Sequence, residues 1–485
     1  MGWNRHSVGT PHRRHGRGPR PTMGSRARNV AALLLICACA APTVRAEEQS
    51  FNLPIGDPAR SDRKVDLVLD GITDTASGAL LTPVELAARL DSVRLLFVGE
   101  SHTDMDFHRV QLRVIQELQK RGRQVLVGLE MYPVTEQASL DRWASEKNLT
   151  EDGFVTDSHW YKNWGYHWNY YRDIFLFARA NGIRMFGVNV PREVVQVART
   201  KGFEGLTAEQ KQMLPERIDT ESAEHQRLFR AFFDDKDALH GNMPDDVFQG
   251  MYRAQCTWDA AMGFNALRAL KQYGGDKAIM VVLIGSGHVA YGLGAERQAK
   301  LWFTGTTASL IPAPVSGPCD GDSLTTVRAS YANFLWGLPP TTDPLYPTVG
   351  ITAPEKKSGE RYKVIMVSDD SPAAAAGFQV GDELVSVDGV KIEDREISNR
   401  IMSEKRWGDA ITYRVMRGGE EITLTVFLRR HPPMQDKAEA AEPTPAASPM
   451  GMPSAPPGIT PAPPAGMPSM PMPSGTPPVP KDPGK

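Results

Sequence analysis

Short apolar runs recur along the first two thirds of the chain, and stretches with helical spacing of apolar residues lie between them. Each run has the length of a buried strand. Between the first two runs, apolar residues recur at helical spacing from Phe107 to Leu118, and Gly122 then ends the pattern. This alternation predicts an α/β domain over residues 51–335, with a mostly parallel sheet flanked by helices. The predicted strands are 94–99, 125–129, 184–190, 278–284 and 301–311, and residues 170–180 predict a further helix.

A different pattern follows Pro339-Pro340, where short strands alternate with glycine-rich turns. Asp388-Gly389 is a tight hairpin signal, and Gly418-Gly419 separates two stretches of alternating apolar and polar residues. We therefore expect a small β-rich domain over residues 343–430. Its predicted elements are a short helix at 373–376, a strand at 383–387, a helix at 396–405 and paired strands at 411–417 and 421–428.

The two ends of the chain have compositions that a packed domain does not. Residues 1–46 contain eight arginines and no acid, followed by an apolar run and a small-residue site at Val44-Arg45-Ala46, the layout of a secretory signal. Cys39 offers a lipidation site, so a lipid anchor is the one membrane link that we expect. Residues 431–485 hold 18 of the 38 prolines and 6 of the 19 methionines, which predicts a disordered tail.

Charge and cysteine content narrow the classes of function. The whole chain has a formal charge of −2, but removal of the leader would leave 47 basic against 57 acidic residues. Such a chain gives no electrostatic support for binding nucleic acid. Cys256 and Cys319 are the cysteines outside the leader, too few for a disulfide scaffold. We expect an exported protein of the periplasm or cell envelope.

Polar, titratable residues follow four of the predicted strands. In open α/β sheets ligands bind beyond the carboxyl ends of the strands, and here those ends carry side chains that a purely structural sheet does not require. His102 and His288 each follow a glycine-containing turn, where the backbone can bend and a ligand can approach closely. The candidate residues are Glu100 and His102, Glu130, Arg192 and His288, with His108 six residues beyond His102 and Tyr291 three beyond His288.

Two further stretches are candidate walls of the same site. Residues 159–171 are rich in tryptophan, tyrosine and histidine, which fits either a loop packed on the sheet or a wall for a flat aromatic ligand or a partner. Gln255, Asp259 and Met262 recur at helical spacing, so one helix face either looks into the cleft or packs on the sheet. The sequence leaves both alternatives open.

Together these motifs resemble the ChaN-type haem-binding lipoproteins of the Tiki and erythromycin-esterase-like superfamily, over roughly residues 65–312. The resemblance implies export, iron or haem uptake, and haem held at a homodimer interface. It implies cofactor binding by His102, His108, Arg192 and His288, with Tyr291 as the tyrosine ligand of iron. The motifs that carry it are Gly99-Glu100-Ser101-His102 with His108 and Gln111, Leu129-Glu130-Met131, Gln137, Trp168 with Tyr171, Asn189-Val190-Pro191-Arg192, residues 255–262, and Gly285-Ser286-Gly287-His288.

Residues 371–390 resemble the PDZ domain of bacterial envelope proteases. The resemblance implies that a C-terminal or extended peptide of an envelope protein adds to the sheet while backbone N–H groups hold its carboxylate. Peptide binding then falls to Tyr346, Val349, Gly350 and Ile351, although Pro347 departs from the usual loop pattern.

Two alternatives to a non-enzymatic haem-binding protein remain at this stage. The first is a metal-dependent hydrolase in which His102, Glu130 and His288 hold a divalent ion, with Glu100 as acid or base, since histidine and carboxylate ligands suit zinc, manganese or iron. The second is a catalytically silent envelope scaffold that recruits partners through the PDZ-like region.

Overall fold

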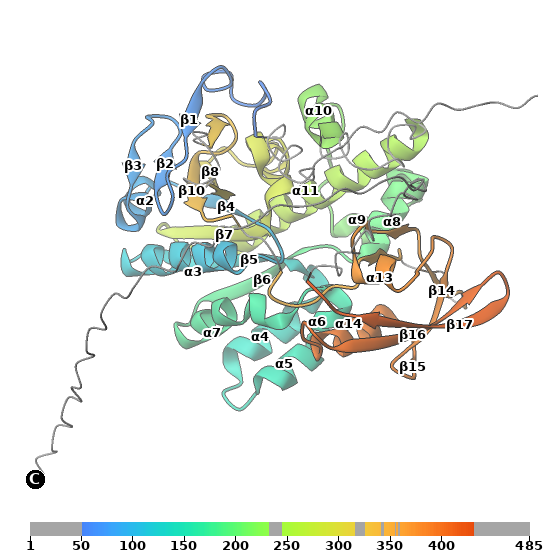
Figure 1. Ribbon diagram of the computed structural model, residues 1–485. Helices are drawn as coiled ribbons and strands as arrows, with labels where there is room; N and C mark the ends of the chain where they lie inside the picture. The colour runs from blue at the N-terminus through green and yellow to red at the C-terminus, as the bar shows by residue number, and fades with distance from the viewer. Residues whose placement is uncertain are drawn as a thin grey trace, which may run out of the picture. The chain divides into compact units, whose positions relative to one another are not determined.

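A single mixed sheet organises the α/β part of the chain (Figure 1). The structure is a computed structural model that describes residues 51–231, 245–315, 325–340, 344–354, 356 and 359–430. Within them the strand order is β3-β2-β10-β8-β4-β7-β5-β6, and neighbours from β10 to β6 run parallel. The strands are β2 (Ile72–Asp74), β3 (Leu80–Leu81), β4 (Leu95–Glu100), β5 (Gln124–Pro133), β6 (Arg184–Asn189), β7 (Ala278–Gly285), β8 (Thr307–Pro314) and β10 (Phe334–Leu338).

The predicted α/β class and its mostly parallel sheet are confirmed. Four of the five predicted strands match β4, β5, β6 and β7 within a few residues. The fifth was placed too early, because residues 301–306 form turns and β8 starts at Thr307. The apolar pattern also missed the antiparallel edge formed by β2 and β3, whose strands are only three and two residues long.

Alternate side chains of the central strands point into two different hydrophobic cores. Leu96 and Val98 of β4 point into one core with Ile279 and Val281 of β7. Leu95 and Phe97 point into the other core with Met280 and Val282. This period-two alternation is what a strand buried on both faces requires.

Helices cover both faces, and Figure 1 shows α3 and α11 on opposite sides of the sheet. The first core includes side chains from α2 (Pro83–Arg89), α3 (Met105–Lys120), α4 (Gln137–Ser145), α5 (Glu151–Asp157), α6 (Trp160–Asn163) and α7 (Arg172–Ala180). The second core includes side chains from α10 (Ala223–Ala231), α11 (Asp245–Tyr273) and α12 (Ala295–Ala299), while α8 (Arg192–Lys201) packs with α11 in a smaller cluster. The remaining elements here are β1 (Lys64–Asp66) paired with β9 (Thr326–Arg328), helix α9 (Ala208–Gln212), and the 3-10 turns η1 (Val134–Glu136), η2 (Trp168–Tyr170), η3 (Phe203–Gly205), η4 (Ser286–His288) and η5 (Ala290–Gly292).

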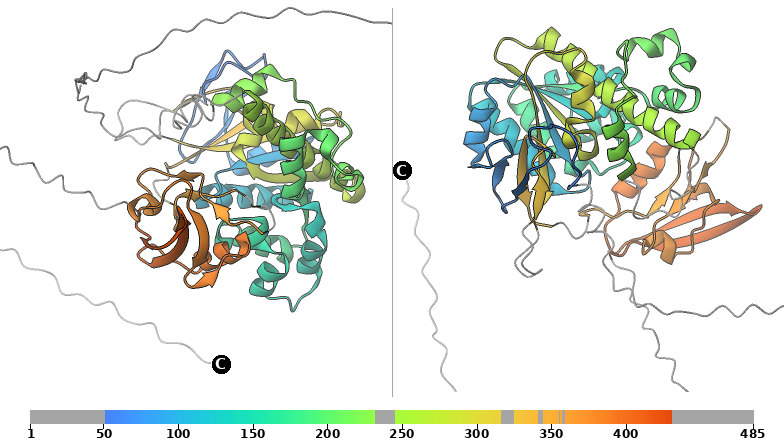
Figure 2. Two further views of the ribbon diagram at one scale, coloured as in Figure 1. Left: turned by 90° about the vertical axis from the view of Figure 1, so that its right-hand side faces the viewer. Right: turned by 90° about the horizontal axis from the view of Figure 1, so that it is seen from above.

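The β-rich region has its own core, as predicted. Its longest feature is the antiparallel hairpin of β16 and β17, which Figure 2 shows as two extended strands. The predicted short helix, strand and longer helix correspond to α13, β14 and α14. The elements are β11 (Ile351–Thr352), β12 (Tyr362–Lys363), β13 (Met366–Val367), α13 (Pro372–Ala375), β14 (Glu383–Val387), β15 (Val390–Lys391), α14 (Arg395–Ser403), β16 (Ala410–Arg417) and β17 (Glu420–Phe427).

Both folded regions belong to one compact unit that extends to Pro432. The predicted leader with Cys39, the predicted tail and Cys319 all lie outside the described residues. Cys256, which the structure does describe, is a buried free thiol. Across the described part of the chain, no helix combines the length and the apolar character that a membrane span requires.

Candidate functional site

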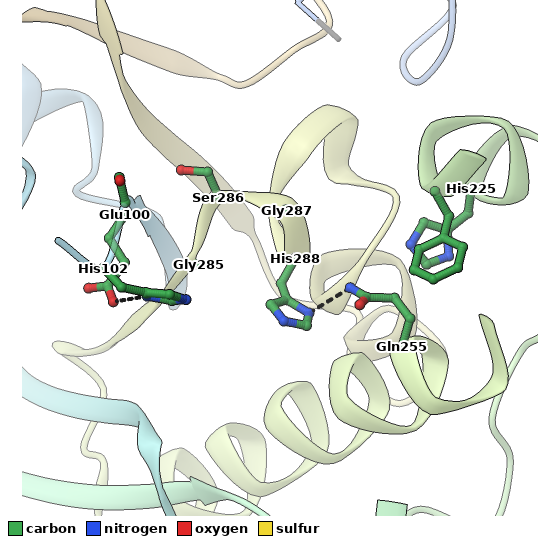
Figure 3. A pocket seen from close by; sticks show the side chains of 10 residues that line it. Glu100, His102, His225, Gln255, Gly285, Ser286, Gly287 and His288 are labelled. Atoms are coloured by element: carbon green, nitrogen blue, oxygen red, sulfur yellow. Dashed lines mark hydrogen bonds and ion pairs between the residues drawn. The ribbon is translucent and has the colours of Figure 1, made fainter. Parts of the chain in front are cut away.

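The carboxyl ends of two neighbouring strands, β4 and β7, meet at a cavity of about 420 Å³. β7 lies between β4 and β5, and Glu100 at the end of β4 is in register with Gly285 at the end of β7. The turns that follow these two strands therefore lie side by side, as Figure 3 shows. The cavity is lined by Glu100, Ser101, His102, His225, Phe229, Gln255, Gly285, Ser286, Gly287 and His288.

Glu100 is a buried carboxylate with a full set of partners. Its Oε1 accepts hydrogen bonds from Tyr171 Oη at 2.6 Å and from His102 Nδ1 at 2.8 Å. Its Oε2 accepts one from Gln111 Nε2 at 2.8 Å and lies 3.4 Å from His108 Nδ1. Burial raises the pKa of Glu100, but the imidazoles of His108 and His102 outweigh it and hold that pKa well below its usual range. Glu100 is thus a fixed negative charge that orients His102.

His102 presents an available ring nitrogen because Glu100 occupies the other one. In its neutral form, a histidine whose Nδ1–H is held by a carboxylate keeps Nε2 as a lone-pair donor, the usual arrangement of metal-ligating histidines. Burial lowers the pKa of His102, but the carboxylates of Glu100 and Glu130 raise it by more. Its ring meets the indole of Trp164 edge-on at 4.9 Å and lies 4.8 Å from the ring of Tyr166. Because a Cβ on Gly285 would approach His102 Cε1 to 3.1 Å, glycine leaves room for this ring.

His288 is held between carboxylates at the opposite side of the cavity. Its Nδ1 lies 2.6 Å from Asp259 Oδ1 and 2.9 Å from Gln255 Nε2, and its Nε2 lies 3.4 Å from Glu130 Oε1. Burial lowers the pKa of His288, yet Asp259 and Glu130 together raise it to about 9. His288 is therefore an imidazolium at neutral pH; its Nδ1–H donates a hydrogen bond to Asp259, and its Nε2–H faces Glu130.

A third histidine, His225, is buried beside Asp259. His225 Nε2 faces Asp259 Oδ2 at 3.5 Å, while its Nδ1 accepts a hydrogen bond from Arg297 at 3.2 Å. Burial lowers the pKa of His225 to about 4, with Arg297 acting in the same direction, so the ring is neutral at pH 7. Asp259 thus lies between one charged and one neutral imidazole.

The structure places the candidate residues in different surroundings. Glu100, His102 and His288 line the cavity, and Glu130 accepts a hydrogen bond from Gly285 N at its edge. His108 lies behind Glu100, with its ring 4.2 Å from that of Tyr171. Arg192 begins α8, is exposed, and donates to Asn163 O.

Tyr291 lies in the second core, outside the lining of the cavity. Its ring packs edge-on against Tyr331, and its hydroxyl accepts a hydrogen bond from Leu53 N at 2.9 Å. Its backbone is left-handed, with φ of 60°. The role of Tyr291 as an iron ligand stays a prediction, to which this placement adds no support.

Sequence reasoning did not assign roles to His225, Phe229 or Ser101 in this cavity. Nothing in the sequence pointed to His225, which lies on a helix far from any strand end. The helical spacing of Gln255 and Asp259 did carry a signal, and both side chains contact His288. Most of the aromatic stretch is buried in the first core, whereas Trp164 and Tyr166 also contact His102.

The divalent-metal alternative required three ligands in one place. Within the part of the chain that the structure describes, no group of three or more histidine, cysteine, aspartate or glutamate side chains is placed to hold a metal ion. His102 and His288 each hold a carboxylate on Nδ1, and Glu130 Oε1 lies 3.4 Å from His288 Nε2. The role of these three residues as ligands of a divalent ion stays a prediction.

The predicted peptide-binding loop lies where β11 begins. Gly350 has φ of +87°, and a Cβ there would lie 2.3 Å from Ser371 Cβ, so the turn requires glycine. Val349 is buried in the core of this region, and Ile351 opens β11, which pairs with β13. The ring of Tyr346 is stacked on His167 at 3.5 Å.

Comparison with known families identifies both regions. Residues 86–298 match the family described as haem-binding uptake, Tiki superfamily, ChaN, and residues 347–428 match the PDZ domain. This chain carries a ChaN-like domain followed by a PDZ domain. The resemblance seen in the sequence is thereby confirmed at the level of these two domains.

Curated relatives match only in part. A protein of Mesorhizobium japonicum, provisionally named a zinc metalloprotease, is 50% identical over 62 residues, which are 13% of this chain and 17% of that protein. Protein RETICULATA-RELATED 5 of Arabidopsis thaliana is 24% identical over 134 residues, 26% of this chain and 17% of that protein. The chain thus spans less than a fifth of the length of either relative.

Solved structures each match part of the chain. ChaN of Campylobacter jejuni, described with cofacial haem binding, is 15% identical with a TM-score of 0.43, over 55% of this chain and 95% of that one. A serine endoprotease of Yersinia pestis is 30% identical with a TM-score of 0.16, over 17% of this chain and 29% of that one.

Proposed function

We propose that this chain is an exported haem-binding protein of the cell envelope, related to iron or haem uptake, whose PDZ domain binds a peptide. The family match of residues 86–298 supports the haem part of the proposal, and the match of residues 347–428 supports the peptide part. Export rests on the composition of residues 1–46, with Cys39 as the candidate lipid anchor.

The observation that carries the haem proposal is the pairing of Glu100 with His102. A carboxylate on Nδ1 fixes the ring, increases the basicity of Nε2 and directs that nitrogen to a metal. Haem, when bound, would supply an iron that accepts such a donor. Its flat ring suits the aromatic side chains of Trp164 and Tyr166 beside His102, and the cavity falls in the size range of ligand pockets. The donor set therefore fits the cofactor that the family name implies.

His288 has a different part in this proposal. As an imidazolium it offers N–H groups and positive charge, which suit an anionic group of the ligand better than a metal ion.

A haemin titration of the full chain tests the proposal. We expect a Soret band that saturates at a defined stoichiometry, and an at least tenfold weaker affinity for His102→Ala. Tyr291→Phe tests the other candidate ligand of iron, Tyr291, whose hydroxyl contacts Leu53 N in the core and does not line the cavity. Lys391→Ala, an exposed change in the PDZ domain, serves as the control. Absence of a saturable Soret band in the unchanged chain would refute haem binding.

A further inference from the structure

One aromatic segment of the ChaN-like domain, residues 159–171, contacts the pocket from one side. The rings of Trp164 and Tyr166 lie 4.9 and 4.8 Å from the ring of His102. At the end of the segment, the hydroxyl of Tyr171 donates to Glu100 at 2.6 Å. The position of this segment therefore affects both members of the Glu100–His102 pair.

The same segment contacts helix α14 of the PDZ domain, which lies in the same compact unit. Asn399 Nδ2 donates to Tyr161 O at 2.8 Å, and His167 Nε2 lies 3.0 Å from Ser403 O. At the start of the segment, His159 Nδ1 lies 3.4 Å from Glu396 Oε2. In PDZ domains, as the resemblance implies, this helix forms one side of the peptide groove.

The loop on the other side of that groove also contacts the segment. Tyr346, the first residue of the predicted carboxylate-binding loop, stacks on His167 with an interplanar angle of 3°. Its hydroxyl accepts a hydrogen bond from Asn169 at 2.9 Å, and its backbone N donates to Tyr170 Oη at 3.2 Å. Both walls of the groove are thus joined to residues 159–171.

The segment is packed into the first core along much of its length. His159 has φ of 49°, an uncommon conformation for a residue with a side chain, which the surrounding contacts must maintain. Trp160, Trp168 and Tyr171 are buried in the first core, and packed interiors transmit displacement instead of damping it. A shift of α14 or of Tyr346 therefore reaches the rings beside His102.

We propose that a peptide bound in the PDZ groove changes the affinity of the pocket for haem through residues 159–171. The inference rests on the haem binding proposed above and adds a regulator of that site. Because coupling between two binding equilibria is reciprocal, haem must change the affinity for the peptide by the same factor. Couplings of this kind are about 5- to 150-fold.

The experiment combines a peptide probe with variants of the full chain. The probe is the strongest binder from a synthetic library of heptapeptides with free C-terminal carboxylates. We expect the probe to change the haemin Kd by fivefold or more, and haemin to change the probe Kd equally. Asn399→Ala, which removes the hydrogen bond to Tyr161 O, should bring this factor close to one, whereas Lys391→Ala should preserve it.

A second measurement distinguishes failure of the coupling from failure of haem binding. Hydrogen exchange of residues 159–171 needs no haem, and we expect Asn399→Ala to increase exchange there while Lys391→Ala leaves it unchanged. If the chain binds no haemin but Asn399→Ala increases exchange in residues 159–171, the proposed function fails. The link between α14 and residues 159–171 then still stands. If haemin binds with the same Kd with and without the probe, and exchange is equal in both variants, the coupling is overturned.

Discussion

His288 Nδ1 lies 2.6 Å from Asp259 Oδ1, and this pair joins the turn after β7 to the middle of helix α11. The pair is a structural tie as well as a part of the pocket, because each member is costly to bury without the other. Its charge state follows from its surroundings, since Asp259 and Glu130 raise the pKa of His288 to about 9.

Replacement of Asp259 by asparagine should lower the pKa of His288 towards its ordinary value of 6.5. The folded pKa of His288 exceeds its unfolded value, so its stabilising contribution is complete below about pH 6.5 and is lost as the pH rises through 9. We expect the free energy of unfolding to fall by roughly 3 kcal/mol across that window in the unchanged chain. Asp259→Asn should make this decrease in the free energy of unfolding smaller, as measured by urea unfolding at several pH values.

Glu117→Gln is the matched control for this prediction. Glu117 is another buried carboxylate, but it pairs with Lys120 and Arg113 rather than with a histidine. Its replacement should leave unchanged the decrease in the free energy of unfolding between pH 6.5 and 9. An equal slope in the unchanged chain and in Asp259→Asn would show that the pair does not hold a proton at neutral pH.

Two other histidines, the buried His225 and the half-buried His167, make the fold sensitive to acid. Burial lowers the pKa of His225 to about 4, and burial together with Arg406 lowers the pKa of His167 to about 4. Between pH 6.5 and 4 the unfolded chain therefore takes up protons that the folded chain does not, and stability falls as the pH drops. For the buried ring of His225 the loss is roughly 2–3 kcal/mol.

The variant His225→Gln should reduce this acid slope while retaining a polar side chain beside Asp259. Urea unfolding at pH 7, 6, 5 and 4.5 measures the slope. His159→Gln is the control, since that imidazole is half exposed. An unchanged slope in His225→Gln would mean that His225 is already protonated in the folded state.

The sequence predicted the central strands of the sheet well because buried strands have a recognisable apolar pattern in the sequence. Strands buried on both faces read as continuous apolar runs, and β4, β5, β6 and β7 were found in this way. The carboxyl ends of those strands then located Glu100, His102 and His288 at one cavity. The strands β2 and β3, three and two residues long, are too short to produce such a run.

The remainder of the site depends on tertiary packing that no local pattern encodes. His225 lies on α10 and meets Asp259 of α11 only in the folded chain. Tyr291 follows His288 closely in sequence, yet the left-handed backbone at Tyr291 carries its ring into the second core. Closeness in sequence to a strand end was therefore an unreliable guide at this position.

Gly285→Ala should disturb the pocket without breaking the fold. Gly285 has φ of −55°, which alanine adopts freely, but its Cβ would lie 3.1 Å from Cε1 and 3.4 Å from Nε2 of His102. We expect a roughly tenfold weaker haemin affinity, equivalent to about 1.4 kcal/mol, because the imidazole must shift. Gly275→Ala is the control, since its Cβ meets only the Oε1 of the Gln124 side chain. Equal Soret titrations of the two variants would contradict the packing of His102 on Gly285.

Gly350→Ala should impair the PDZ domain more than an equivalent change elsewhere in it. Gly350 and Gly389 both have positive φ, of +87° and +81°, so alanine at either position incurs a backbone cost of about 1 kcal/mol. Only at Gly350 does the new Cβ meet another residue, Ser371, whose Cβ would be 2.3 Å away. We therefore expect Gly350→Ala to lower the stability of the PDZ domain by about 1–3 kcal/mol beyond Gly389→Ala, the range for overpacking. Hydrogen exchange across residues 349–428 of the full chain measures the difference, and equal protection in the two variants would show that the loop relaxes around the added methyl group.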